Sequence, residues 1–505
     1  MLYRQGWQGR PQGFRPLVVA LTGALLLLAS CVNGNREYDE AEYSAFGEYV
    51  HALDTLQMGQ CLTHLLNADT SRWAADDPIH SRYAAFGTYE NAPLWFSREG
   101  VSSQADSLLS LLHRELSRNG LDTAAFFLPQ IAADLEVVRQ LAFDSVGQSI
   151  NEVLPRLDYL LSKAYARYTV GQRYGFVRPD KLLNHMDYKT DGEGFARLFD
   201  YEVKAPDYHE PVRKLEGTDR MDYLYQSQPV DPLYRTLQRE LAAASDQASR
   251  QKIAVNMERC RWQMKRPGGP DRYVLVNIPA QHLWAVGGDT VLDMRICCGA
   301  FATKTPLLHS EITHLQVNPD WIIPPSIVKN EVSAHGGDSA YFARHRYYII
   351  DRHSGDTLDP AGVTGDDMRA GGYRIGQKGG AGNSLGRIVF RFANNFGVYL
   401  HDTNNRSAFQ RERRTLSHGC VRVQKPFDLA CFLMPGASEW TLDRIRLAMN
   451  SSPDHAYYDI SPRVPVFIIY HTVYPNPKTG AVEQWPDLYG YDKAISREMK
   501  PFLPQ

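Results

Sequence analysis

The stretch YVLVNIPAQHLWAVGGDTVLDMRI, residues 273–296, has the pattern of three consecutive β-strands. Valine, isoleucine, leucine and aromatic residues, which favour strands, fill the runs 273–278, 282–286 and 291–296. Gly287, Gly288 and Asp289 separate the second run from the third, and such a group suits a tight hairpin turn. We therefore predict that a β-rich domain begins here.

Strand-like runs continue toward the C-terminus. They lie at 312–317, 347–351, 387–392, 398–401 and 464–470. Such a series is typical of a β-sandwich or barrel. Between these runs, residues 325–383 are rich in glycine and aspartate, which predicts a mobile flap over a site.

Toward the N-terminus the pattern changes to helical. Apolar residues recur at spacings of three and four, as at 105–118, and predict a mainly helical scaffold domain over 46–265. Within it, 188–229 lacks a clear period and is expected to be a loop-rich insertion. We predict a multidomain α+β protein in which a β-sandwich-like domain (266–495) follows the helical scaffold and 496–505 form a tail.

The first residues have the features of an export signal. Arginines precede a short apolar run at 17–29, which is too short for a comfortable membrane span. The following Leu-Ala-Ser-Cys at 28–31 resembles the lipobox of bacterial lipoproteins, which implies a signal peptide over 1–31, lipidation of Cys31 and a tether over 32–45. An ordinary cleaved signal with an incidental cysteine is the alternative.

A lipidated Cys31 predicts an exported protein held by its lipid at the periplasmic face of a bacterial membrane. Val32 gives no clear signal for retention in the inner membrane, which favours the outer membrane. A formal net charge of -2 makes binding to nucleic acid a poor expectation. The seven cysteines are sparse and form no C-x-x-C pair, so neither a disulfide framework nor a structural zinc site is indicated.

Reactive residue types gather in Tyr-Leu-His-Asp at 399–402 and Ser-His-Gly-Cys-Val-Arg-Val at 417–423. A thiol nucleophile needs a base, a group that orients the base, and donors for a developing oxyanion. Cys420 is the candidate nucleophile, and His401 and His418 are the candidate bases. Gly419 lacks a side chain and lets the backbone approach the substrate closely.

These two segments resemble the active-site signature of the L,D-transpeptidases, in the large subfamily with an N-terminal helical scaffold. Further matching segments lie at 304–306, 317–321, 382–386 and 487–492. The resemblance implies that Cys420 is the acyl-forming nucleophile and His401 its general base and later acid. It also implies oxyanion or substrate-binding roles for Tyr399, Ser417, His418, Gly419 and Arg422.

By the same resemblance, the reaction is a double acyl transfer on peptidoglycan stem peptides, donor and acceptor. Cys420 would attack the L-centre carbonyl of the diamino acid in a tetrapeptide stem and release D-alanine. An amine would then resolve the thioester, which gives a 3-3 cross-link or attaches a protein. No cofactor is required, and inhibition by carbapenems is expected.

Other interpretations of these residues stay open. Water as acceptor would give an L,D-carboxypeptidase or endopeptidase, and loss of catalysis would leave a wall-binding lipoprotein. A metal site at His401, His418 and Cys420 is disfavoured because His-Gly-Cys crowds two ligands. Asp402 either orients His401 or caps a turn, and Trp321 is expected in the core.

Overall fold

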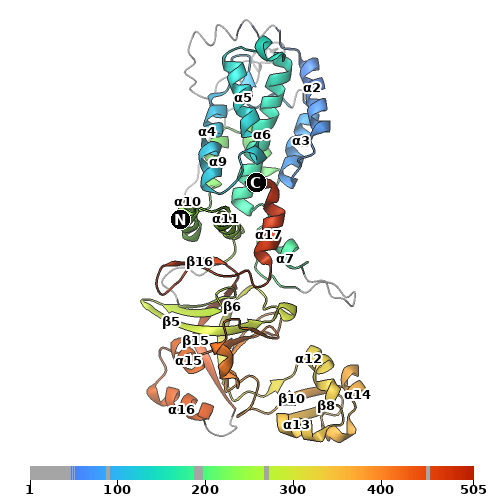
Figure 1. Cartoon of the computed structure of the whole chain (residues 1–505), viewed down its shortest axis with the longest axis vertical. Coiled ribbons are helices and arrows are strands. Elements are labelled where there is room, and N and C mark those ends of the chain that lie inside the picture. The colour runs from blue at the N-terminus through green and yellow to red at the C-terminus, as the bar shows by residue number, and fades with distance from the viewer. Residues whose placement is uncertain are drawn as a thin grey trace, which may run out of the picture.

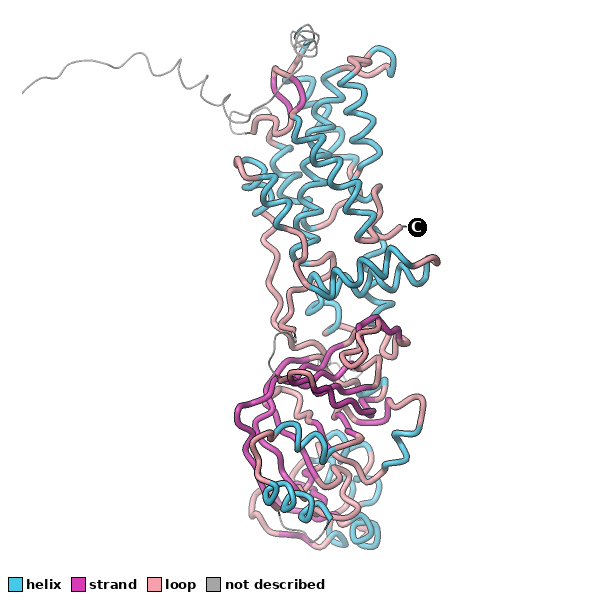
Figure 2. The backbone as a smooth tube through the Cα atoms, turned by 90° about the vertical axis from the view of Figure 1, so that its left-hand side faces the viewer, coloured by secondary structure: helices cyan, strands magenta, loops and turns pink. Residues whose placement is uncertain are grey.

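The computed structural model describes Gly47, Tyr49 and residues 52–86, 91–186, 197–266, 272–450 and 455–504. Figure 1 shows an elongated molecule with helices at one end and strands toward the other, and Figure 2 shows the same segregation from the side. The predicted order of a helical part followed by a β-rich domain is confirmed. The predicted signal peptide, Cys31 and the tether lie outside the described residues.

The helical part consists of antiparallel and crossing helices around one long helix. Its helices are α2 (Thr55–Ala68), α3 (Asp77–Ala84), α4 (Ser103–Arg118), α5 (Leu128–Arg139), α6 (Ile150–Tyr174), α7 (Pro179–Leu183), α8 (Glu210–Glu216), α9 (Arg220–Gln226), α10 (Pro232–Ala243) and α11 (Gln247–Arg261). A small hairpin joins β1 (Phe96–Ser97) and β2 (Gly100–Val101). Among the described helices, none is long and apolar enough to cross a bilayer.

Helix α6 forms the axis of this part. It begins at a capping box in which the Ser149 backbone N–H donates to Glu152, and it ends at Gly175, whose φ of +87° suits only glycine. Nearly all of its side chains are buried, so it packs on every face. It therefore carries charged residues into the core, and these need partners.

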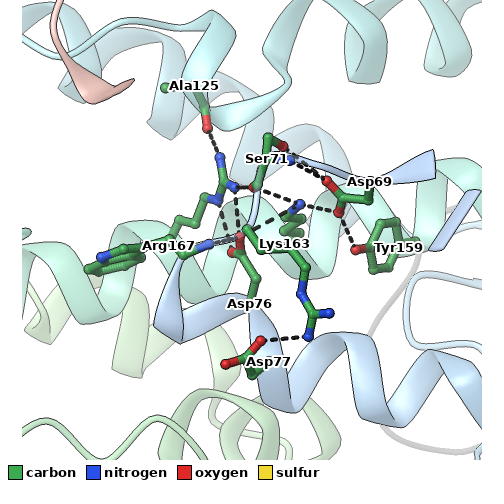
Figure 3. A network of polar contacts seen from close by, with 10 residues as sticks. Asp69, Ser71, Asp76, Asp77, Ala125, Tyr159, Lys163 and Arg167 are labelled. Carbon is green, nitrogen blue, oxygen red and sulfur yellow. Dashed lines mark hydrogen bonds and ion pairs between the residues drawn. The ribbon is translucent and has the colours of Figure 1, made fainter. Parts of the chain in front are cut away.

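Figure 3 shows how those charges are paired. Arg167 on α6 makes a bidentate ion pair with Asp76, at 2.6 and 2.8 Å, and Lys163 pairs with Asp69 and with Asp76. The Tyr159 hydroxyl also donates to Asp69, at 2.7 Å. Because a buried charge is costly without a partner, this network holds the segment between α2 and α3 against α6.

The loop-rich insertion predicted at 188–229 is wrong for its second half. Helices α8 and α9 occupy Glu210–Glu216 and Arg220–Gln226, each with a buried leucine. Pro211 stands at the first turn of α8, where its missing N–H costs nothing. These helices are only seven residues long, which is too short for a clear apolar period in the sequence.

The β-rich domain is built on a nine-stranded mixed sheet. Its strands are β3 (Tyr273–Asn277), β4 (His282–Gly287), β5 (Thr290–Gly299), β6 (Leu308–Val317), β11 (Ile388–Phe392), β12 (Leu400–His401), β13 (Thr415–Ser417), β14 (Val421–Val423) and β15 (Ala456–Ile469). Their order is β13-β5-β14-β12-β11-β6-β15-β3-β4, and β4 also pairs with β5. The order thus returns on itself around a core, as the predicted sandwich or barrel requires.

Other elements border this sheet. They are α15 (Pro426–Leu433), α16 (Glu439–Asn450), β16 (Val473–Pro475) and β17 (Val482–Gln484). The predicted hairpin at Gly287–Asp289 is confirmed, since Gly287 pairs with Thr290. The sheet and the helical part are joined by direct contacts, because Phe199 bridges Leu307 and the Tyr201 hydroxyl donates to the Ile468 carbonyl.

The segment predicted as a flap is a folded subdomain. It contains β7 (Trp321–Ile322), α12 (Pro325–Asn330), α13 (Ser339–His345), β8 (Tyr347–Asp351), β9 (Thr357–Leu358), α14 (Gly365–Ala370) and β10 (Tyr373–Gln377). Its strands form a separate sheet in the order β7-β10-β8-β9, over its own apolar core that includes Phe342 and Ile349. We name residues 321–377 the inserted subdomain.

We predicted a tail over residues 496–505, but this C-terminal segment is folded. Helix α17 (Tyr491–Met499) and a 3₁₀ turn return to the helical part, and Figure 1 shows α17 next to it. The Phe502 side chain is buried, and its ring centre lies 4.6 Å from that of Phe176. The Phe502 carbonyl accepts from the Asp122 N–H. Burial of Phe502 and Leu503 explains the difference.

Candidate active site

The two predicted segments meet on neighbouring strands. β12 and β14 run parallel, with Leu400 opposite Val421 and His401 opposite Arg422. The Val421 N–H also donates to the Tyr399 carbonyl at 3.1 Å, so Tyr399 and Cys420 lie side by side. The intervening Leu400 and Val421 are buried in the core.

Because side chains alternate along a strand, the residues on either side of Leu400 and Val421 all face the opposite way. The four residues on that face are Tyr399, His401, Cys420 and Arg422. Cys420 and His401 are diagonal neighbours there. The structure thus brings the predicted nucleophile and base to one face.

The loop before Cys420 is held in a strained turn. Gly419 has a φ of +117°, and an added Cβ would meet no atom closer than 3.6 Å. The glycine is therefore required by the backbone angle rather than by space. The Ser417 hydroxyl accepts from the Gly419 N–H at 3.2 Å and donates to the Cys420 carbonyl at 2.5 Å, which closes the turn.

A second layer fixes this turn from below. The hydroxyl of Thr305 donates to the Gly419 carbonyl at 2.8 Å and accepts from the Gly299 N–H at the same distance. The buried Tyr489 hydroxyl in turn donates to the Gly299 carbonyl at 2.7 Å. The segments 304–306 and 487–492, noted from sequence, thus support the nucleophile loop.

His401 is buried, and its ring is oriented by a backbone group. Nδ1 lies 2.5 Å from the Asp402 carbonyl oxygen, which can only accept, so Nδ1 carries the proton. Burial, followed by the nearby charge of Arg422, lowers the pKa of His401 to about 3. The ring is neutral at physiological pH, with Nε2 unprotonated.

The carboxylate of Asp402 has another task. It accepts from the Arg387 N–H at 2.9 Å and pairs with Arg406 at 2.7 Å. Of the two roles left open from sequence, orienting His401 or capping a turn, these contacts of the carboxylate fit the second. The main-chain carbonyl of Asp402, not its side chain, orients His401.

The thiol of Cys420 is also neutral at rest. Burial raises its pKa to about 11, against the opposing effects of a backbone hydrogen bond from the Tyr399 segment and the charges of Arg422 and Arg391. A neutral thiol and a neutral imidazole on one face of the sheet differ from a preformed thiolate–imidazolium pair. The thiol proton must then leave as the sulfur attacks.

His418 points to a different partner. Its Nε2 lies 2.7 Å from Oε1 of Glu331, at the end of α12 in the inserted subdomain. Both side chains are about half exposed. His418 therefore connects the loop that carries Cys420 to the subdomain, whereas His401 lies on the strand face that carries Cys420.

Comparison with known proteins agrees with this geometry. Residues 271–442 match the family model of the L,D-transpeptidase catalytic domain, and residues 82–241 match that of the scaffold domain. The chain contains an L,D-transpeptidase catalytic domain. A Haemophilus influenzae protein described as "Putative L,D-transpeptidase" is 29% identical over 341 residues, which cover 65% of this chain and 68% of that protein.

Three residues near the candidate site were not assigned to it from sequence. Trp321, expected only in the core, packs on the core of the inserted subdomain and acts to lower the pKa of the Tyr399 hydroxyl. The Arg391 guanidinium carbon lies 4.9 Å from the centre of the Tyr399 ring. Glu331 contacts His418. Of these, only Trp321 had a sequence signal, since it ends the matching segment 317–321.

Tyr399 and Arg422, which the sequence predicts to contact the substrate, lie on the face that carries Cys420. The Tyr399 pKa is raised to about 12, mainly by burial, so its hydroxyl stays protonated. The Arg422 Nε is buried and has no hydrogen-bond partner among the described residues. Both side chains therefore retain donors on the face that carries Cys420.

Proposed function

We propose that the transpeptidase domain forms a thioester between Cys420 and a peptidoglycan tetrapeptide stem, releases D-alanine and transfers the acyl group to an amine. The observation that carries the proposal is the common face of Cys420 and His401, on adjacent parallel strands of a domain that matches the transpeptidase family. This is the placement that nucleophile and base chemistry needs.

In the first transfer, Nε2 of His401 takes the thiol proton while the sulfur attacks the L-centre carbonyl of the diamino acid. The C–N bond to D-alanine then breaks, and the imidazolium returns the proton to the leaving amine. In the second transfer, neutral His401 takes a proton from the acceptor amine as it attacks the thioester. The Cys420 sulfur leaves and is reprotonated.

The oxyanion of each tetrahedral intermediate needs hydrogen-bond donors. The Gly419 N–H already donates to the Ser417 hydroxyl, so Gly419 and Ser417 serve to shape the loop. We assign the donor roles to the Cys420 N–H and the Tyr399 hydroxyl. Because burial raises the pKa of Tyr399, its hydroxyl keeps the proton that it would donate to the substrate.

We also propose that the protein is exported and acts at a membrane surface. The lipobox-like segment supports lipidation of Cys31 and export, and peptidoglycan stems would then be accessible from the periplasmic face of a membrane, the outer one favoured. A nucleophile of this kind is also expected to be acylated by carbapenems.

Incubation of the purified protein with a disaccharide-tetrapeptide tests the reaction, with intact-protein and product masses as the measurement and the Cys420→Ala variant as control. We expect Cys420-dependent loss of D-alanine and a cross-linked dimer. A tripeptide alone would indicate a hydrolase. A folded protein that yields neither product nor acyl-enzyme would indicate a wall-binding lipoprotein.

A further inference from the structure

We propose that Arg391 is a specificity residue of this site and binds a carboxylate of the peptide stem beside Cys420. The inference rests on the proposed function and adds a subsite to it, on a strand outside both predicted segments. Its ligand class is a peptide carboxylate.

The sheet register places Arg391 in the row of the nucleophile. On β11, Val389 lies opposite His401 and Phe390 opposite Leu400, so Arg391 is level with Tyr399. Phe390 is buried in the core, which turns Arg391 toward the face of Tyr399 and Cys420. The guanidinium carbon lies 4.9 Å from the Tyr399 ring centre, and the Arg391 charge favours the Cys420 thiolate.

Neutral groups hold this side chain in place. Nη2 of Arg391 donates to Oε1 of Gln316 at 3.2 Å, and Nε2 of Gln316 donates to the Tyr457 hydroxyl at 2.9 Å. The Arg391 carbonyl accepts from the Thr313 hydroxyl at 3.2 Å, where the pairing of β6 and β11 shifts register. The guanidinium is thus oriented in advance, and the groups that orient it carry no charge.

No carboxylate neutralises this charge within the described residues, where Arg391 makes no ion pair. Glu331 is engaged by His418 and Asp402 by Arg406. Asp459, on the same row of the sheet, lies two strands from Arg391, which is roughly 10 Å at the usual strand spacing.

A half-buried guanidinium without an acid partner has N–H donors arranged for the two oxygens of a carboxylate. Two carboxylates of the stem remain on the acyl side when D-alanine leaves. One is the α-carboxylate of the γ-linked glutamate, and the other is the D-centre carboxylate of a diaminopimelate residue. Both present the same chemistry to Arg391.

The test measures the rate of acyl-enzyme formation by intact-protein mass with three tetrapeptide stems. One has both carboxylates free, one has the glutamate amidated, and one has lysine in place of diaminopimelate. For the wild-type protein we expect loss of one carboxylate to slow acylation by roughly 10- to 100-fold, the range for a lost hydrogen bond to a charged group.

The variant Arg391→Gln is expected to react slowly with the free-carboxylate stem and to show no further loss with the modified stem. The modified stem that reacts more slowly than the free-carboxylate stem with wild type, but not with Arg391→Gln, identifies the carboxylate that Arg391 binds. Arg391→Lys keeps the charge but loses the paired N–H donors of the guanidinium, so its acylation rate is expected to lie between those of wild type and Arg391→Gln. Arg463→Gln, at an exposed position on β15, is the matched control and should behave as wild type.

Equal discrimination among the stems by wild type and Arg391→Gln, with both folded by thermal unfolding, overturns the inference but leaves the proposed function standing. A wild-type protein that no stem acylates contradicts the proposed function instead. Equilibrium binding of the stems to Cys420→Ala, with and without Arg391→Gln, then decides about Arg391. Equal affinities of the two proteins for the stems would show that Arg391 does not bind a stem carboxylate.

Discussion

The Nε2 atom of His418 lies 2.7 Å from Oε1 of Glu331, a residue 87 positions earlier in the chain. The contact joins the loop that carries Cys420 to the inserted subdomain. Since both side chains are about half exposed, the pair is expected to contribute only about 0–1 kcal/mol. Such a contact positions the subdomain near the nucleophile without locking it there.

The two histidines of the site are expected to differ strongly on substitution. His401→Ala removes the proposed general base and should reduce acylation of Cys420 by about 10²- to 10⁴-fold. His418→Gln loses only an exposed pair, so its effect should stay within roughly fivefold. Reactions with a tetrapeptide, quenched at set times and analysed by intact-protein mass, measure the acylation rates of both variants.

Glu331→Gln is the control for this comparison and should match His418→Gln, because each variant breaks the same contact. The assignment of the base is reversed if His418→Gln proves the more damaging variant in a protein that unfolds at the wild-type temperature.

The thiol is expected to react as a neutral group at rest. Because the Cys420 pKa is about 11, the thiolate fraction should rise nearly tenfold per pH unit between pH 6 and 9. Alkylation by iodoacetamide, counted as the difference from Cys420→Ala, should follow that slope. A plateau below pH 8 would instead indicate a preformed thiolate–imidazolium pair.

The pKa of His401 predicts how the rate of acylation changes at low pH. The pKa of His401 is lowered to about 3, so the ring is neutral and able to accept a proton well below pH 6. Acylation by a tetrapeptide should therefore persist at pH 5. A loss of rate centred near 6.5, the ordinary value for histidine, would contradict the buried environment of the ring.

The turn at Gly419 should not tolerate a side chain. Gly419→Ala is expected to cost about 1–3 kcal/mol of stability, because alanine disfavours a φ of +117°. Acylation should fall too, since the Cys420 N–H shifts with the loop. Denaturant unfolding and acylation rates measure the two effects.

Gly436→Ala is the matched control, since a Cβ at that position meets no atom within 4 Å and the backbone angle is ordinary. It should leave both measurements near wild type. A Gly419→Ala variant of unchanged stability would show that the turn relaxes freely.

The buried ion pairs of the helical part are expected to matter for stability. Asp76→Asn leaves Lys163 and Arg167 short of a partner and should lower the free energy of unfolding by about 3–5 kcal/mol. Asp77→Asn breaks an exposed pair with Arg72 and should cost about 0–1 kcal/mol. Urea titration compares the two variants, and equal losses would refute the distinction.

The same network should weaken in acid. Burial alone would raise the pKa of Asp69, but hydrogen bonds from Lys163 and Tyr159 outweigh it and lower that pKa to about 2. Because the folded pKa is depressed, the contribution of Asp69 is full above about pH 4 and is lost as pH falls toward 2. Lys163→Met should flatten this part of the stability profile.

Local patterns were sufficient for much of the fold and for the centre of the site. Alternating apolar residues predicted the strands around 273–296, and the turn at Gly287–Asp289 followed from its residue types. Alternation also placed Tyr399 and His401 on one face. These features depend on residues close together in the chain, so sequence alone predicts them.

The sequence alone therefore determined the order of a helical part and a β-rich domain and the motif that carries Cys420. Only the tertiary structure decided that Glu331 takes His418, that Arg391 reaches Tyr399 and that Phe502 returns to the helical core. The physical reason is that each of these contacts joins segments far apart in the chain. An isolated glutamate, arginine or phenylalanine has many equivalent partners until the whole chain has packed.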